Sequence, residues 1–106
     1  QNEKIKKFYN SVNILLITSL FESSPNVVLE AFANGVPVVS TPNEGSKKLI
    51  KNNFNGLISK DFKVKNLISC LTKVLKSRKE YSKNSKKTFL NIYNFEKNIN
   101  KINSYF

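Results

Sequence analysis

The chain has 106 residues, 40% of them hydrophobic, and carries a formal net charge of +11. This length fits one compact domain, and the longest mainly apolar stretch, residues 12–21, is well short of the ~20 residues of a membrane span, so no transmembrane helix is expected. With one cysteine, Cys70, and no histidine, the sequence excludes an internal disulfide and lacks the usual nitrogen and sulfur ligands of zinc, which favours a reducing, cytoplasmic setting without a metal site.

Hydrophobic periodicity and turn residues divide the chain into alternating helices and strands. In chain order they predict a helix over residues 4–9, a strand over 13–18, a helix over 25–33, a strand over 36–41, a loop over 42–45, a helix over 46–51, a turn over 52–56, a strand over 57–59, a helix over 64–75, and two helices over about 79–92 and 95–104. The first two strand predictions rest on apolar or β-branched runs, which are typical of buried parallel strands.

The helix over residues 25–33 has the clearest boundaries. Ser24 is a natural N-cap, and Pro25 has the fixed backbone angle that suits the first helical position. Asn34 and Gly35 follow as a stop signal.

This order of elements predicts an α/β fold, a Rossmann-like parallel sheet in three α/β/α layers with right-handed crossovers. Three parallel strands leave an edge uncovered, which is unusual for a parallel sheet. We therefore expect further strands upstream and interpret residues 1–106 as one partial domain, with residues 79–106 as its terminal helices.

Two carboxylates lie near the start of the helix over residues 25–33: Glu22 in the preceding loop and Glu30 inside the helix. A helix that follows a parallel strand points its unpaired N–H groups into the crevice at the carboxyl edge of the sheet, where a diphosphate would bind. Glu30 lies roughly 7 Å along that helix, near the place of a ribose attached to such a diphosphate. From spacing alone, solvent-exposed carboxylates at both positions are an equally good interpretation.

The segment over residues 21–39 resembles the E-x7-E signature of retaining, two-domain glycosyltransferases, the large family that includes sucrose-phosphate and bacterial glycan and lipopolysaccharide transferases. Glu22 and Glu30 are the two glutamates of the signature. The other matching positions are Ser19, Pro25, Ala31, Phe32, Ala33, Gly35, Pro37, Val38, Val39, Gly45, Asn55, Gly56, Leu57 and residues 93–97. Together they are far more specific than the glutamate pair and extend over nearly the entire chain.

The resemblance implies a GT-B fold, of which this chain is the C-terminal portion of the donor-binding domain. It implies transfer of a sugar from a nucleotide-diphosphate sugar to a glycan or lipid-linked acceptor with retention, without an essential metal or other cofactor. It also implies that Glu30 binds the ribose and that Glu22, the catalytic position, faces the donor sugar. The residues implied to hold sugar and phosphate, largely through backbone amides, are Ser23, Ser24, Pro25, Asn26 and Val27.

Three positions depart from the family pattern: Ser23 replaces a glycine, Glu44 replaces the first residue of a Gly-Gly pair, and Lys48 replaces a glutamate. In the family, the Arg and Lys that neutralise the leaving diphosphate lie upstream, and the N-terminal domain holds most of the acceptor. Because transfer depends on that charge stabilisation, we expect hexosyl-type transferase activity from the full-length protein and little or none from this chain alone.

The net charge is the compositional outlier, since such a field attracts phosphates, nucleic acid or anionic lipid. Only one of the eighteen basic residues is arginine, which favours a general compositional bias over a specific nucleic-acid partner. Two alternatives stay open: a non-catalytic or degenerate nucleotide-sugar-binding module, and a basic protein that binds nucleic acid or an anionic membrane. Peripheral contact with the inner face of the membrane is compatible with the main interpretation.

Overall fold

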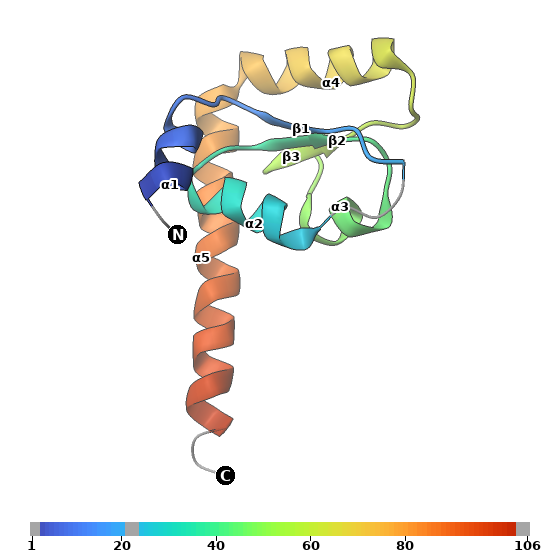
Figure 1. Cartoon of the computed structure of the whole chain (residues 1–106). Helices are drawn as coiled ribbons and strands as arrows, with labels where there is room; N and C mark the ends of the chain where they lie inside the picture. Colours follow the sequence, from blue (N-terminus) through green and yellow to red (C-terminus); the bar gives the residue numbers. More distant parts are fainter. Residues whose placement is uncertain (1–2, 21–23, 104–106) are drawn as a thin grey trace.

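The computed structural model describes residues 3–20 and 24–103, in which helices and strands alternate as the sequence predicts (Figure 1). The helices are α1 (Glu3–Asn10), α2 (Pro25–Ala33), α3 (Glu44–Leu49), α4 (Val64–Lys76) and α5 (Arg78–Asn103). The strands are β1 (Leu15–Ile17), β2 (Val38–Ser40) and β3 (Gly56–Ile58).

The three strands form one parallel sheet in the order β1-β2-β3. In its middle row Leu16 is paired with Val39, and Val39 is paired with Leu57. The predicted parallel α/β sheet is therefore confirmed, with β2 in the centre and β1 and β3 at the two edges.

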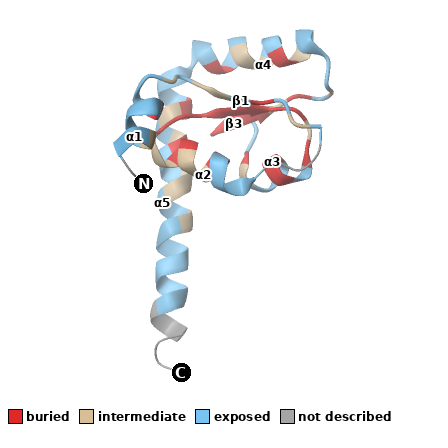
Figure 2. Cartoon of the chain, in the orientation of Figure 1, coloured by how far each residue is buried: buried red, intermediate tan, exposed pale blue. Residues whose placement is uncertain are grey.

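Helices cover both faces of the sheet, because successive side chains of a strand point to opposite sides. Val38 of β2 packs into one core cluster with Val28 and Phe32 of α2. Its neighbour Val39 packs into a second cluster with Leu67 and Val74 of α4. Figure 2 shows the buried sheet between α4 on one side and α2 and α3 on the other, which confirms the predicted three layers.

The boundaries of α2 arise from local signals that the sequence makes visible. The Ser24 Oγ accepts a hydrogen bond of 3.3 Å from the backbone N–H of Asn26 and caps the first turn. At the other end Gly35 has a φ of 70°, and its N–H donates to the carbonyl oxygen of Phe32 at 3.0 Å. A glycine adopts this left-handed conformation without steric cost, so the predicted start and stop are both confirmed.

The prediction for α3 is wrong by about two residues. Residues 42–45 were expected to form a loop before a helix over 46–51, whereas α3 begins at Glu44 and ends at Leu49. The cause is Asn43, whose Oδ1 accepts a hydrogen bond of 2.9 Å from the backbone N–H of Ser46. Asn43 therefore acts as the N-cap and starts the helix earlier.

The prediction of two terminal helices is also wrong, since α5 runs unbroken from Arg78 to Asn103. No proline or glycine lies between residues 92 and 95, and the two residues there, Tyr93 and Asn94, have only a mildly unfavourable helix propensity. Residue 104, the expected end, lies outside the described residues.

The first half of α5 is fixed to the turn that leads into β3. The Asn55 side chain is fully buried, and its Nδ2 donates to the Thr88 Oγ1 at 3.1 Å. Asn84 donates from its Nδ2 to the carbonyl oxygen of Phe54 at 3.1 Å. Beyond these contacts α5 projects from the body of the molecule (Figure 1), and Phe95 is 65% exposed.

Gly56 fills a position that leaves no room for a side chain. A Cβ added to Gly56 would lie 1.9 Å from the backbone oxygen of Val38 on the neighbouring strand. The close approach of β3 to β2 therefore depends on the missing side chain.

Among residues 3–20 and 24–103, no helix combines the length and the apolar character needed to cross a bilayer.

Candidate functional site

The candidate site lies at the carboxyl edge of the sheet, where β1 and β2 end and α2 begins. The Thr41 side chain, directly after β2, joins the loops at this edge. Its Oγ1 donates a hydrogen bond of 2.6 Å to the carbonyl oxygen of Ser19, which lies after β1. Ligands of parallel α/β sheets bind at this edge, because helix N-termini and loops converge there.

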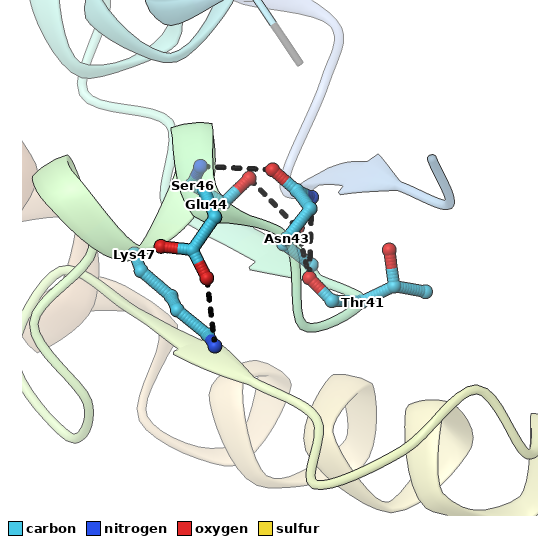
Figure 3. Close-up of polar contacts among 6 residues, drawn as sticks. Thr41, Asn43, Glu44, Ser46 and Lys47 are labelled. Carbon is cyan, nitrogen blue, oxygen red and sulfur yellow. Dashed lines mark hydrogen bonds and ion pairs between the residues drawn. The ribbon is translucent and has the colours of Figure 1, made fainter. Parts of the chain in front are cut away.

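A buried polar cluster shapes the loop between β2 and α3 (Figure 3). The Ser40 Oγ lies 2.8 Å from both the Ser46 Oγ and the carbonyl oxygen of Thr41. Asn43 donates from its Nδ2 to the Ser40 Oγ at 3.1 Å and to the carbonyl oxygen of Thr41 at 3.2 Å. Because buried polar groups are costly when unpaired, these reciprocal bonds hold the loop in one conformation.

Two of the positions that depart from the family pattern lie on the surface of α3. Glu44 is exposed and forms an ion pair of 3.4 Å with Lys47 (Figure 3). Because both side chains are open to solvent, this ion pair contributes little to the stability of the fold. Lys48 is exposed as well. The third departure, Ser23, lies outside the described residues.

The first turn of α2 presents backbone donors to solvent. The residues Ser24, Pro25, Asn26 and Val27 are all exposed. The N–H of Val27 donates to the carbonyl oxygen of Ser24 at 3.3 Å, a long bond like the 3.3 Å bond from Asn26 to the cap. Weak bonds in an exposed helix N-terminus leave these N–H groups able to donate to an anion.

Glu30 lies in the second turn of α2 and is half-buried. It faces Tyr9 of α1, whose ring is buried in the core cluster below α2. The pKa of Tyr9 is raised by burial first, and then by the charge of the Glu30 carboxylate and a hydrogen bond with it. Because its pKa is raised, the Tyr9 hydroxyl keeps its proton at neutral pH and can donate it to the neighbouring Glu30 carboxylate.

The described site residues are divided between two concave surfaces. Ser24 and Val27 line a hollow beside β1. Asn26 and Glu30, one helical turn apart, line another between α1, α2 and α5, together with Phe89. The chain thus places the predicted residues on one helix without enclosing them in one pocket. Glu22, the predicted catalytic residue, lies outside the described residues with Ser23.

The sequence analysis missed the residues that support this site, above all Tyr9, Thr41 and Asn43. A signal for Tyr9 was present, since it lies four residues after Ile5 and therefore on the apolar face of α1. A tyrosine buried on such a face needs a hydrogen-bond partner for its hydroxyl. No comparable signal exists for Thr41, because its bond to Ser19 joins residues 22 positions apart.

The potential metal ligands and the single cysteine can be placed in the part of the chain that the structure describes. No three His, Cys, Asp or Glu side chains there lie close enough to hold a metal ion. Cys70 is half-buried in α4, and burial raises the pKa of its thiol.

The sequence of this chain is similar to parts of several named glycosyltransferases. An α-1,3-galactosyltransferase of Escherichia coli, named for UDP-Gal and α-D-GlcNAc-diphosphoundecaprenol, is 27% identical over 92% of this chain and 26% of its own length. The lipopolysaccharide core biosynthesis glycosyltransferase LpsE of Rhizobium meliloti is 38% identical over 50% of the chain and 16% of its own length. The chain therefore spans about a quarter or less of these relatives.

A solved structure and a family profile give the same assignment as these relatives. Sucrose-phosphate synthase from Thermosynechococcus elongatus superimposes with a TM-score of 0.77 over 92% of this chain and 25% of its own, at 20% identity, which supports the GT-B fold. The sequence profile of the family described as Glycosyl transferases group 1 matches residues 1–89. The chain belongs to this glycosyltransferase family.

Proposed function

We propose that the chain is the donor-binding part of a retaining glycosyltransferase. The complete protein would transfer a hexosyl-type sugar from a nucleotide-diphosphate sugar to a glycan or lipid-linked acceptor. The family supports the transferase class, and the names of the relatives support an acceptor in polysaccharide or lipopolysaccharide synthesis. We place the reaction in the cytoplasm, at the inner face of the membrane where a lipid-linked acceptor would be presented.

One observation carries the donor site: α2 presents its N-terminal N–H groups at the carboxyl edge of the sheet, and Glu30 follows in its second turn against Tyr9. The donor diphosphate binds at the exposed first turn, where N–H groups and the helix dipole stabilise its charge. Glu30 accepts hydrogen bonds from the two ribose hydroxyls. The hydroxyl of Tyr9 keeps the carboxylate oriented for that contact.

Catalysis itself is assigned to Glu22, which on this proposal faces the donor sugar. The leaving diphosphate is stabilised by cationic side chains of the complete protein and by backbone N–H groups, without an essential metal or other cofactor. The 106-residue chain alone should therefore transfer no sugar. Robust turnover of a nucleotide sugar by this chain would overturn that part of the proposal.

The decisive experiment is a calorimetric titration of the chain with UDP, GDP and ADP, comparing the wild type with Glu30→Ala and Glu44→Ala. Loss of hydrogen bonds to a charged group weakens binding by about 1.5–3 kcal/mol, so Glu30→Ala should raise the Kd by about tenfold or more. Glu44→Ala removes the same charge from an exposed ion pair and should leave the Kd unchanged. Equal effects of both substitutions, or no effect of Glu30→Ala, would refute the assignment of Glu30.

A further inference from the structure

A third concave surface lies at the amino edge of the sheet, and it shares Asn34 with the hollow that Glu30 lines. It is bordered by Asn13 before β1, by Val36 before β2 and by the first turns of α5, and its volume is about 550 Å³. We call it the basic hollow. The side chains that give it this character are Asn10, Asn13, Arg78, Lys79, Lys83 and Lys86.

The cations of the basic hollow are held on one face of a docked helix. Lys79, Lys83 and Lys86 follow at helical spacing, so they project from the same side of α5. Ser82 on that side donates from its Oγ to the carbonyl oxygen of Gly35 at 2.5 Å, which fixes the helix to the turn between α2 and β2. The aliphatic part of the Lys86 side chain lies against the same turn. Its Cε is 3.0 Å from the point where a Cβ would lie if Gly35 had a side chain.

Among the residues that the structure describes, no carboxylate lines the basic hollow. Among the described residues the one ion pair joins Lys47 to Glu44, far along the chain from these cations. The acidic residues beside them, Glu30 and Glu80, line other hollows. Four gathered cations without a carboxylate partner create a local positive potential, which an anion would relieve.

The composition of the basic hollow selects the kind of anion. Arg78 is the single arginine of the chain, and its planar guanidinium matches the geometry of phosphate oxygens better than an ammonium does. Asn10, at the end of α1, and Asn13, before β1, add neutral amide donors to the lining. Several cations are matched by a group with more than one negative charge rather than by a single carboxylate.

We propose that the basic hollow binds a phosphate group of more than one charge, a diphosphate or a phosphate monoester, at a site separate from the donor site. The inference stands on the geometry of α5 and does not depend on the proposed transferase function. The phosphate belongs either to a free molecule or to a lipid headgroup, and both sources present the same oxygens to the lysines and the arginine.

The test is a titration of the 106-residue chain with inorganic pyrophosphate, followed by the NMR shifts of its backbone amides. Saturable shifts are expected over residues 34–36 and 78–86, whereas binding at the donor site would shift residues 24–27. The double variant Lys83→Gln with Lys86→Gln should raise the Kd about tenfold, since two charged donors are lost. The matched control, Lys65→Gln with Lys73→Gln on α4, removes the same charge away from the basic hollow.

The outcomes separate the site from a general charge effect. Equal weakening by the two double variants, shifts confined to residues 24–27, or a lack of saturation would overturn the proposal. Thermal melting of both variants shows whether each is folded, and Lys79→Gln provides a single substitution at an exposed position of the basic hollow.

Cosedimentation with vesicles that contain phosphatidic acid, a lipid phosphate monoester, distinguishes the two sources. Vesicle binding that the Lys83 and Lys86 substitutions reduce about tenfold, and the control pair does not, identifies a lipid headgroup. Binding of pyrophosphate without binding of vesicles identifies a free diphosphate.

Discussion

At the residue scale, Glu30 depends on a neighbour from another helix. A carboxylate that accepts two hydroxyl groups binds best when its orientation is fixed before the ligand arrives, because less side-chain entropy is then lost. On the proposed function, Tyr9 of α1 supplies that constraint, since its hydroxyl neighbours the Glu30 carboxylate. The pair would then keep a half-buried glutamate in one orientation before the ribose binds.

Removing the hydroxyl of Tyr9 tests this role. Tyr9→Phe keeps the buried ring and should weaken nucleotide binding by about twofold to twelvefold, since the net value of one hydrogen bond is about 0.5–1.5 kcal/mol. Tyr81→Phe is the matched control, because Tyr81 is equally buried but packs in the other core cluster. Calorimetry should show a higher Kd only for Tyr9→Phe, and an effect of the same size in both variants would argue against positioning.

The same two tyrosines predict the pH dependence of stability. Burial raises the pKa of Tyr9 and of Tyr81 above the ordinary value of 10.0, so the folded state holds their protons more tightly than the unfolded state does. The resulting stabilisation is fully present below about pH 10 and is lost as the pH rises through the folded-state pKa. Urea unfolding at a series of pH values should show the decline in the wild type.

The double variant Tyr9→Phe with Tyr81→Phe should flatten that decline, whereas Tyr93→Phe, a change at an exposed position of α5, should not. An unchanged slope in the double variant would mean that other groups control alkaline unfolding.

At the element scale, the predictions succeed at the two ends of α2, miss the local cap Asn43 that starts α3, and do not reach contacts between residues far apart in the chain. The start of α2 is determined by Ser24 and Pro25 and its end by Gly35, and each of these residues affects only the neighbouring turn of the helix. The apolar spacing of residues 79–104 is helical throughout and holds no stop signal, in agreement with the continuous α5. Its docking depends on Ser85 and Asn55, partners about 30 residues apart that no periodic pattern reveals.

The two structural glycines should differ sharply in their tolerance of a side chain. Gly56→Ala places a Cβ against the backbone of β2 and should lower the free energy of unfolding by on the order of 3 kcal/mol or more. Gly35→Ala faces mainly the flexible Lys86 side chain and a left-handed backbone, and should cost about 1–2 kcal/mol. Chemical denaturation measures both, and equal losses would contradict the close approach at Gly56.

At the scale of the whole molecule, the sheet is covered unevenly. α4 packs on β2 and β3, while Leu16 of the edge strand β1 is 43% exposed. The sequence predicts an uncovered strand edge from the count of strands, and β1 and β3 lie at the two edges of the sheet. It did not predict that the candidate residues of α2 would face two separate hollows, because that division depends on how α1 and α5 pack around the helix.

An exposed apolar edge strand favours pairing between chains. Leu16→Lys should therefore reduce self-association of the 106-residue chain, and light scattering at increasing concentration measures it. Leu90→Lys changes a leucine that is 54% exposed on α5, where no strand edge is available, and should have little effect. If Leu90→Lys reduced association as strongly, added charge rather than the edge of β1 would be responsible.

The bond between Asn55 and Thr88 also sets an order of events during synthesis. Asn55 emerges from the ribosome 33 residues before Thr88, and until then one donor of its amide lacks that partner. A buried amide short of a partner carries a desolvation penalty of about 1–3 kcal/mol, which disfavours early closure of the turn into β3. Docking of β3 is therefore completed late in synthesis. In a chain interrupted before residue 88, β3 is held less firmly, and completion of α5 stabilises its place in the sheet.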